Sequence, residues 1–433
     1  MTIPGARSVK DAVELVRPVD TLGVPLGPGQ PAAFLHGLAT RDDFTDLTIF
    51  GALLVDLFAV FTKPGVKYLS GFFGPAERLL VESGANVEFV PSDFRRFGPI
   101  AQRLNPRIVA TLATPPDTDG WMSLSLHAGA TIGELERAAA DPKRLLIVEC
   151  NAHAPRTFGI GPDHLHRVHL DQVDMLVESD LPIVEIPDDV PSPIDVRIAE
   201  HVRRYVVDGC TLQTGIGGIP STIAAMLADD DGGDYGVHSE MFTTGLMRLH
   251  QAGKVTNTDK GQFSGMSITT FALGSRALYD FLDGNDEVRF LPVDIVNAPQ
   301  IAARNRRMVT INGAIAIDLW GQAVADTIGA KQFSGIGGHE DFVSVAGFEL
   351  EDRSLLCLPS TSTVDGQVVS RISAQLAAGS VITTPRHQLD VVATEFGIAS
   401  LRGRTVRERA TALAKIAHPD FRESLLAQAH ALR

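Results

Sequence analysis

The stretch "TLQTGIGGIPSTIAAML", residues 211–227, decides the fold class of this 433-residue chain. It begins as a short apolar strand pattern, passes through a glycine-rich turn, and continues as an apolar helical pattern with Pro220 near the first helical turn. Strands that alternate with helices in this way are typical of α/β proteins. The glycines permit positive φ and let a ligand approach the backbone, and the free N–H groups of a helix N-terminus favour an anion.

The same alternation continues along the chain. Buried strands are predicted at three further apolar runs, namely "LLIVEC" (145–150), "SITTFAL" (267–273) and "LDVVAT" (389–394). These patterns predict an α/β fold with largely parallel sheets.

One segment indicates where the domains meet. "EIPDDVPSPID" (185–195) holds three prolines and three aspartates without periodicity, which predicts a linker and hence domains 1–188 and 189–433. In the second domain, "RMVTINGAIAIDLWGQAVAD" (307–326) alternates apolar and polar residues and is broken at Asn312-Gly313. This pattern indicates an antiparallel hairpin or added edge strands.

Composition limits the class of protein. The net charge of −14 and the pI of about 5.4 argue against nucleic acid as a partner, although one small anion can still bind in a locally basic pocket. We find no apolar run of about 18 residues and no secretory leader pattern, so we expect no membrane association and a cytoplasmic location. Cys150, Cys210 and Cys357 lie in apolar runs, as expected for buried thiols in a reducing compartment.

Two glycine loops are candidate ligand sites. In the first, Gly215, Gly217 and Gly218 are followed by Ile219-Pro220, so the dinucleotide fingerprint G-x-G-x-x-G is not met. A ligand-binding loop and a plain turn between strand and helix both remain open. The second loop, "SGIGGHE" (334–340), aligns several N–H groups along one edge, which suits an oxyanion or a pantetheine-like chain, with a flexible turn as the alternative.

Acidic and histidine side chains offer further candidates. Three glutamates, Glu149, Glu240 and Glu395, follow strand patterns, so each can face a ligand beyond the carboxyl ends of parallel strands, or serve as a capping or structural acid. Periodicity does not rank them. "HLHRVH" (164–169) lacks nearby cysteine or acidic partners at metal-ligand spacing, so we expect solvated histidines and no metal site.

Read together, many ordered segments resemble the acetyl-CoA hydrolase/transferase family, which includes 4-hydroxybutyrate and butyryl-CoA:acetate CoA-transferases. The resemblance covers nearly the whole chain, and it is carried by "TGIGGIP", "GVHSEMFTTG", "VNAPQIAARN", "INGAIAIDLWGQ", "FSGIGGHEDF", "ITTPR", "TEFGIASLRGRTVRERA" and "IAHPDFRESL". It implies two CoA-transferase-type (NagB/RpiA-like) α/β domains with the active site in the cleft between them. Glu240 and the loop glycines match the family pattern, but the sequence departs from it at positions beside them: Ser239 stands where Thr is common and His339 where Gln is common.

The resemblance also implies a mechanism. Glu240 corresponds to the catalytic glutamate, whose carboxylate attacks the thioester and then carries CoA as a glutamyl thioester. Asn297 and an amide of the second loop, Gly337, correspond to the donors that stabilise the oxyanion. Positions matching stretches that lie against CoA are Gly215, Ile216, Gly217, Gly218, Gly335, Gly337 and Gly338. For the CoA phosphates, the candidate cations are Arg304, Arg306, Arg307, Lys331 and Arg386.

The expected activity is therefore transfer of CoA from a short-chain acyl-CoA to a carboxylic acid of the acetate, butyrate or 4-hydroxybutyrate class. Hydrolysis by the same glutamate, with water as the acceptor, is the alternative. A catalytically silent acyl-CoA-binding protein is disfavoured because Glu240, Asn297 and both loops are kept, and a dehydrogenase because the fingerprint fails. CoA is then a substrate, no cofactor or metal is held tightly, and a homodimer or larger homo-oligomer is expected.

Overall fold

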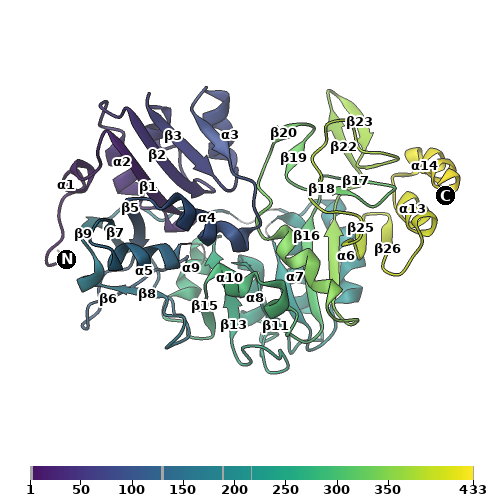
Figure 1. Cartoon of the computed structure of the whole chain (residues 1–433). Coiled ribbons are helices and arrows are strands. Elements are labelled where there is room, and N and C mark those ends of the chain that lie inside the picture. Colours follow the sequence, from purple (N-terminus) through teal and green to yellow (C-terminus); the bar gives the residue numbers. More distant parts are fainter. Residues whose placement is uncertain (1–2, 128–130, 188–189, 216, 433) are drawn as a thin grey trace. The chain divides into compact units, whose positions relative to one another are not determined.

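The computed structural model describes residues 3–127, 131–187, 190–215 and 217–432. Contacts along the chain divide it into two compact units. Unit 1 takes the chain up to residue 187 together with Ile268–Val296, and unit 2 takes the remainder. The boundary expected at 188/189 lies beside the first crossing between units, whereas the segment Ile268–Val296 packs with unit 1. Each unit has a main sheet of its own (Figure 1).

Unit 1 is built on a seven-stranded sheet in the order β4-β3-β2-β1-β5-β7-β9, and every neighbouring pair is parallel. Its strands are β1 (Val19–Leu26), β2 (Asp46–Ala52), β3 (Val66–Ser70), β4 (Val87–Phe89), β5 (Ile108–Ala113), β7 (Leu145–Asn151) and β9 (Met175–Ser179). Ile108 and Ala110 belong to one apolar core and Val109 to another, because successive side chains of a strand point to opposite faces. Both faces are therefore covered, as is usual for parallel sheets.

The helices of unit 1 supply the two cores. Helices α1 and α2 contribute to the core on one face, and α5 to the core on the other. The helices are α1 (Val9–Glu14), α2 (Ala32–Leu38), α3 (Pro75–Glu82), α4 (Phe97–Leu104), α5 (Ile132–Ala140), α9 (Arg276–Leu282) and α10 (Val293–Val296). Two small ribbons complete the unit: β6 (Trp121–Ser123) with β8 (Arg167–His169), and β13 (Ser267–Thr269) with β15 (Val288–Phe290).

Unit 2 is built on a six-stranded sheet in the order β11-β10-β16-β21-β25-β26. Its strands are β10 (Thr211–Thr214), β11 (Gly236–Val237), β16 (Met308–Gly313), β21 (Arg353–Cys357), β25 (Val391–Thr394) and β26 (Gly397–Ser400). Only the edge pair β25–β26 is antiparallel among these. The chain moves from β10 outward to β11 and later returns to β16 on the other side of β10. Such a reversal marks the point at which α/β sheets bind ligands, beyond the carboxyl ends of the strands.

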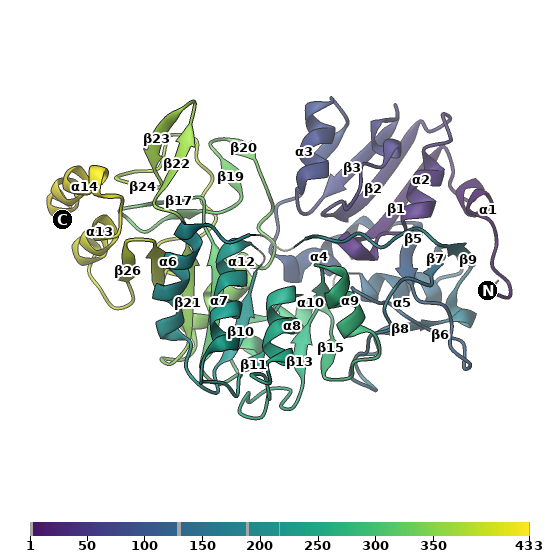
Figure 2. The same ribbon diagram turned by 180° about the vertical axis from the view of Figure 1, so that it is seen from behind.

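Helices α6, α7 and α8 lie side by side in unit 2 (Figure 2). The helices of this unit are α6 (Pro193–Val202), α7 (Gly218–Asp229), α8 (Thr244–Gln251), α11 (Pro299–Ala302), α12 (His339–Val343), α13 (Val406–Lys415) and α14 (Pro419–Ala431). Small sheets are formed by β17 (Ala316–Asp318), β18 (Ala323–Val324) and β24 (Ile372–Ser373), by β19 (Thr327–Ile328) and β20 (Lys331–Gln332), and by β22 (Thr361–Val364) and β23 (Gln367–Ser370).

The prediction of an α/β fold with largely parallel sheets is confirmed. The hairpin expected at Asn312-Gly313 is wrong, because β16 is a central parallel strand that ends there. The antiparallel turn comes later, between β17 and β18, at Gly321 with φ of +84°. The run 267–273 is also no long strand, since it is divided between β13 and the two-residue strand β14 (Phe271–Ala272).

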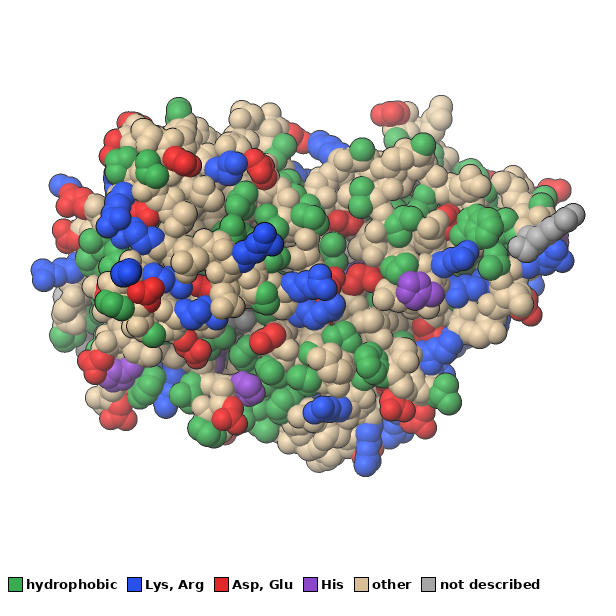
Figure 3. Space-filling view, in the orientation of Figure 1, with side chains coloured by type: hydrophobic (Ala, Val, Ile, Leu, Met, Phe, Trp, Pro, Cys, Tyr) green, Lys and Arg blue, Asp and Glu red, His purple; other side chains and the backbone are tan. Residues whose placement is uncertain are grey.

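The three cysteines, the length of the helices and the surface charges bear on the expectations drawn from composition. Cys150, Cys210 and Cys357 are buried free thiols, as predicted. Within the described ranges, no helix is both long enough and apolar enough to cross a membrane. On the face seen in Figure 3, basic and acidic side chains are interspersed rather than gathered by sign.

Candidate active site

The structure separates the three strand-end glutamates by their partners. The carboxylate of Glu149 accepts hydrogen bonds from the backbone N–H groups of Ala33 (3.2 Å) and Phe34 (3.0 Å) in the first turn of α2. That of Glu395 accepts from the backbone N–H (2.9 Å) and hydroxyl (2.7 Å) of Ser360. Both acids satisfy donors that would otherwise be buried without a partner, which is a structural role. Glu240 is different, because its partner is an amide side chain.

Glu240 lies three residues beyond the end of β11, and the preceding serine holds this turn. The Ser239 hydroxyl lies 2.9 Å from the carbonyl oxygen of Met241 and 3.1 Å from that of Thr214, the last residue of β10. It also accepts from the Thr214 N–H at 3.4 Å. Helix α8 then begins at Thr244, with the Thr243 side chain as its N-cap. The turn is thus tied to the carboxyl end of the neighbouring strand, where the sheet reverses its order.

Asn297 bridges two carboxylates. Its Nδ2 donates to Glu240 Oε2 at 2.5 Å and to Asp341 Oδ2 at 3.0 Å. Asn297 is 1% exposed and Asp341 0% exposed, whereas Glu240 is only partly buried. The amide must point its NH2 group at this pair, because the opposite orientation would set its oxygen against two acceptors. Three residues that are far apart in the sequence therefore meet at one amide.

This environment shifts the acidity of Glu240. Burial is the main cause that raises its pKa from 4.5 to about 8; the hydrogen bond from Asn297 opposes the shift, and the negative charge of Asp341 adds to it. A carboxylate that is costly to ionise is a more basic, and so a more reactive, nucleophile once ionised. The arrangement suits covalent chemistry better than a structural role does.

The second glycine loop closes on the same carboxylate. A Cβ atom added to Gly338 would lie 1.9 Å from Glu240 Oε2 and 2.5 Å from Asn297 Nδ2. Gly337 has φ of +55°, a left-handed conformation that favours glycine. Gly337 thus forms the turn, and Gly338 allows the backbone to approach Glu240 closely. Gly335 lies buried earlier in the loop.

Two neighbouring threonines anchor this loop. The Thr384 hydroxyl is hydrogen-bonded to His339 Nε2 (2.8 Å) and to Glu340 Oε1, at the start of α12. At the other end, the Thr383 hydroxyl donates to Asp326 Oδ1 at 2.5 Å. The backbone oxygen of Asp326 in turn accepts from the N–H groups of residues 333 and 334. The burial of His339 lowers its pKa to about 4, so this imidazole is neutral near pH 7.

The first glycine loop connects β10 to α7. Gly217 has φ of +120°, and an added Cβ at Gly215 or Gly217 would meet no atom within 4 Å. Gly218 instead faces Asp195 of α6, whose Oδ2 would lie 2.6 Å from an added Cβ. Two glycines of this loop are therefore open toward their surroundings, and the third is used for helix packing. Ile216 lies outside the described residues.

The predicted cations are divided by the sheet. Arg306 and Arg307 lie just before β16, at the amino ends of the strands, whereas Glu240 lies beyond their carboxyl ends. Both arginines form ion pairs with Asp259, at 2.8 and 2.9 Å. Arg304 lines a cavity of about 740 Å³ at the same amino ends. These three are poorly placed for a phosphate of a thioester bound at Glu240. Arg386, by contrast, lies two residues after Thr384 of the loop anchor.

No metal centre emerges from the histidines. The expectation of solvated histidines is wrong for His166, which is buried: its Nε2 lies 2.8 Å from both Thr157 Oγ1 and Ser125 O, and its ring stacks on Phe290. His169 caps a short helix through Asp171 N. The described part of the chain contains no group of three or more His, Cys, Asp or Glu side chains arranged to hold a metal.

Two residues of this site received no role from the sequence. Asp341 and Thr384 lie within "FSGIGGHEDF" and "ITTPR", but neither segment carries a local signal for its side-chain partner. A buried acid inside a short motif rich in glycine is the one signal that points to Asp341.

Known proteins share the sequence pattern of this chain. Residues 274–429 match the family model of the acetyl-CoA hydrolase/transferase C-terminal domain. Over 96% of its length the chain is 33% identical to a succinyl-CoA:cyclohexane-1-carboxylate CoA transferase from Geobacter metallireducens, covering 92% of that protein. It is 34% identical to a 4-hydroxybutyrate coenzyme A transferase from Clostridium kluyveri, covering 92% of this chain and 91% of that one.

The chain belongs to the acetyl-CoA hydrolase/transferase family. Its fold is shared with the crystal structure of RipA from Yersinia pestis, with a TM-score of 0.89 at 30% identity, over 99% of this chain and 97% of that one. The protein is therefore an enzyme of the acyl-CoA:carboxylate CoA-transferase type.

Proposed function

We propose that Glu240 transfers CoA from a short-chain acyl-CoA to a carboxylic acid through a covalent glutamyl-CoA thioester. The observation that carries the proposal is the meeting of Glu240, Asn297 and Gly338 at one carboxylate. The acyl class is supported by the names of the relatives, which act on succinyl-CoA and 4-hydroxybutyrate. CoA is a substrate in this scheme, and no tightly bound cofactor takes part.

Each step exchanges one bond for another. A carboxylate oxygen of Glu240 attacks the thioester carbonyl, the C–S bond breaks, and an acyl-glutamyl anhydride and CoA thiolate result. The thiolate then attacks the glutamyl carbonyl carbon, which releases the first acid as a carboxylate and leaves CoA on Glu240. An acceptor carboxylate reverses both steps and departs as a new acyl-CoA. The anhydride keeps the energy of the thioester available for transfer.

The neighbours of Glu240 have matching roles. Each attack places negative charge on a carbonyl oxygen, and a fixed donor at that oxygen is typically worth about 10²–10³ in rate. We assign this role to Asn297 Nδ2, which already touches the nucleophile, and to an amide of the Gly337-Gly338 turn. Gly215 and Gly217, where an added Cβ would meet no atom within 4 Å, would leave room for the pantetheine arm.

Hydrolysis is the second candidate, because the family includes hydrolases and the same glutamyl thioester reacts with water. The two activities differ in what they need. A transferase releases CoA in proportion to added carboxylate, whereas a hydrolase turns over without a second acid.

The pH dependence should report the surroundings of Glu240. We expect kcat/KM to rise with pH along a limb of apparent pKa about 8, because only the ionised form attacks. Asn297→Ala should move this limb to higher pH and lower kcat by about 10²–10³-fold, since it removes a donor from the carboxylate and from the oxyanion. Asp341→Asn should move the limb to lower pH, since it removes a negative charge. A limb that both variants shift in the same direction would contradict the assignment.

The covalent intermediate can be trapped directly. Wild-type protein mixed briefly with short acyl-CoAs and quenched in acid should gain the mass of CoA less that of a water molecule, and Glu240→Ala should not. The same tubes should be assayed for free CoA, because release without an adduct indicates rapid hydrolysis of the thioester. An adduct of equal size on Glu240→Ala would place the nucleophile elsewhere.

A further inference from the structure

Unit 2 holds a cavity that has no role in the chemistry described above. Its volume of about 740 Å³ is within the usual range for sites that bind small molecules. The turn from α11 to β16 supplies one wall, with Arg304 and Asn305, and the segment before β21 supplies the other, with Glu349, Glu351 and Asp352. Both walls lead into the amino ends of neighbouring parallel strands, whereas the nucleophile lies beyond the carboxyl end of β11. The cavity is therefore separate from the active site.

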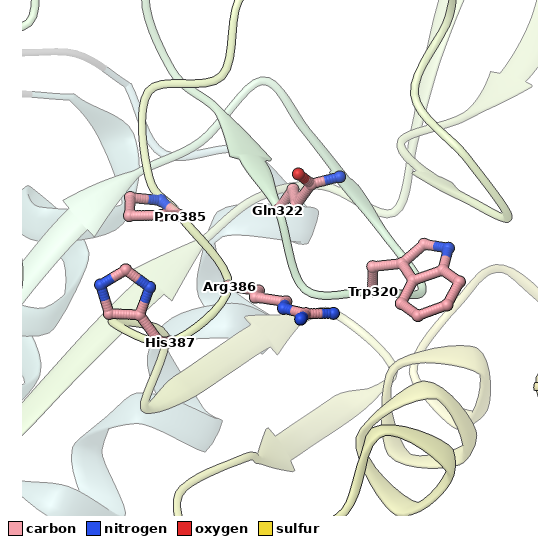
Figure 4. A pocket seen from close by; sticks show the side chains of 5 residues that line it. All are labelled: Trp320, Gln322, Pro385, Arg386 and His387. Carbon is pink, nitrogen blue, oxygen red and sulfur yellow. The ribbon is translucent and has the colours of Figure 1, made fainter. Parts of the chain in front are cut away.

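Another cavity of unit 2 adjoins the active site instead. Figure 4 shows this cavity, of about 430 Å³, with Arg386 between the side chains of Trp320 and His387. Pro385 of its lining directly follows Thr384, whose hydroxyl is hydrogen-bonded to the residue after Gly338. The cavity at the α11–β16 turn is lined by other segments of the chain, so its ligand is a separate question.

Two buried side chains of the α11–β16 cavity each have an oxygen without a hydrogen-bond partner. Asp352 is 1% exposed; its Oδ1 accepts from the Met308 N–H at 2.8 Å, but its Oδ2 has no partner within the described structure. Asn305 is 2% exposed; its Nδ2 donates to the Ala302 carbonyl at 2.9 Å, but its Oδ1 likewise lacks a partner there. Leaving a buried acceptor without a donor is costly, so both oxygens favour a ligand that brings N–H groups.

The charged side chains of this cavity are unevenly paired. Arg306 and Arg307 both form ion pairs with Asp259. Within residues 3–127, 131–187, 190–215 and 217–432, the lining residues that form no ion pair are Arg304, Glu349, Glu351 and Asp352. The unpaired groups are thus one basic and three acidic side chains, which favours a ligand that carries more positive than negative charge.

The acidic wall is held in place from behind. Arg402 Nη2 donates to the backbone carbonyl oxygens of Ala346 (2.7 Å) and Asp352 (2.9 Å) and to Asp390 Oδ2 (3.1 Å). This guanidinium group therefore orders the segment but does not bond to the Asp352 carboxylate. Burial raises the pKa of Asp352 to about 6, so its ionised form gains from a cation placed beside it. A wall that is already ordered also lowers the entropic cost of binding.

A metal ion fits these groups less well than an ammonium group does. Calcium takes about 6–8 oxygen ligands, and magnesium demands near-octahedral geometry. The described part of the chain contains no group of three or more His, Cys, Asp or Glu side chains arranged to hold a metal. A primary ammonium group carries only three N–H donors and is satisfied by a few oxygens on facing walls.

We propose that this cavity binds a diamino acid of the lysine or ornithine type. The α-ammonium group donates to Asp352 Oδ2 and Asn305 Oδ1, the carboxylate pairs with Arg304, and the second ammonium group lies at Glu349 and Glu351. Each unpaired charged group of the lining then gains a partner of opposite charge. The proposal is independent of the proposed function, because it uses other residues than the chemistry at Glu240.

Calorimetric titration of the whole chain with three probes tests this assignment. The probes are L-lysine, cadaverine, which lacks the carboxylate, and L-norleucine, which lacks the second ammonium group. L-Lysine should bind wild type most tightly. Asp352→Asn places an NH2 group at the unpartnered oxygen and should weaken all three probes by about 10–100-fold.

Two exposed changes separate the two ends of the ligand. Arg304→Gln should weaken L-lysine and L-norleucine by about 2–5-fold and leave cadaverine no weaker, because an exposed ion pair is worth little. The double variant Glu349→Gln/Glu351→Gln should weaken L-lysine and cadaverine by about 2–10-fold and leave L-norleucine unchanged. If Asp352→Asn does not fold in thermal melts, these two variants decide the test.

Matched controls are Arg197→Gln on α6 and Glu423→Gln on α14, both exposed, which should bind every probe as wild type does. L-Lysine and CoA should also bind together, since their sites lie at opposite ends of the strands. The proposal is overturned if no probe binds wild type below about 10 mM, which would mean that water alone satisfies both oxygens. It is equally overturned if CoA displaces L-lysine, if the controls weaken binding as much as the site variants do, or if Ca²⁺ or Mg²⁺ binds here in place of the amines.

Discussion

Glu240→Gln should abolish CoA transfer, with a loss in kcat of about 10⁴-fold or more, while the protein stays folded. The amide keeps the size of the side chain, but its oxygen is much less nucleophilic than a carboxylate oxygen and does not attack a thioester. Removal of a covalent nucleophile causes some of the largest losses in kcat that a single substitution produces. Rates of acyl-CoA consumption with a saturating carboxylate, measured on freshly purified protein, check this result. Glu240→Ala run in parallel guards against slow deamidation of the glutamine.

The matched control is the same change at another strand-end acid. Glu395→Gln places an NH2 group against the donors of Ser360, so we expect a cost of about 1–3 kcal/mol in stability with kcat within a few-fold of wild type. If Glu240→Gln kept more than a hundredth of the activity, or if Glu395→Gln lost as much, Glu240 would not be the nucleophile.

Thermal stability gives an independent test of the Glu240→Gln variant. The folded-state pKa of Glu240, about 8, lies above its usual value of 4.5, so the folded protein binds more protons than the unfolded chain between these values. Its contribution to stability is therefore fully present below pH 4.5 and is lost as the pH rises through 8. The Tm of Glu240→Gln minus the Tm of wild type should therefore be larger at pH 9 than at pH 5. A difference in Tm that does not change with pH would contradict the raised pKa.

Gly338→Ala should lower kcat by about 10²-fold or more with little loss of stability. The backbone at Gly338, with φ of −88° and ψ of 11°, is open to any L-residue, so conformational strain is not the cause. The new methyl group would overlap Glu240 Oε2, at 1.9 Å, and crowd Asn297 Nδ2, at 2.5 Å. The carboxylate is the end of a flexible chain and can move aside, but a displacement of about 1 Å is enough to cost 10²-fold in rate.

Gly347→Ala is the control for this substitution. Gly347 ends the short helix η6 (Ser344–Gly347) that follows α12, is exposed, and would place its Cβ in open space. It should leave both kcat and Tm unchanged. Steady-state kinetics and thermal melts of the two variants decide the matter: a Gly338→Ala enzyme with wild-type kcat would show that the loop does not touch the reacting carboxylate, and a large drop in Tm would show that the position is structural.

The fold was readable because its signals are local. The strand, turn and helix at 211–227 are recovered as β10 and α7. The failed hairpin has a physical reason. Asn312-Gly313 is a strong turn signal by itself, but β16 is hydrogen-bonded on both sides by parallel strands, and those neighbours decide the path of the chain.

By itself, the sequence determined the α/β class, the glycine loops and, through family resemblance, the choice of Glu240 and Asn297. It could not distinguish Glu149, Glu240 and Glu395 by pattern, because all three end apolar strands. Only the tertiary structure shows that Glu149 and Glu395 accept bonds from backbone or hydroxyl donors, whereas Glu240 shares Asn297 with Asp341. The reason is physical: reactivity depends on burial and on charges within a few ångströms, and these come from segments about 50–100 residues apart along the chain.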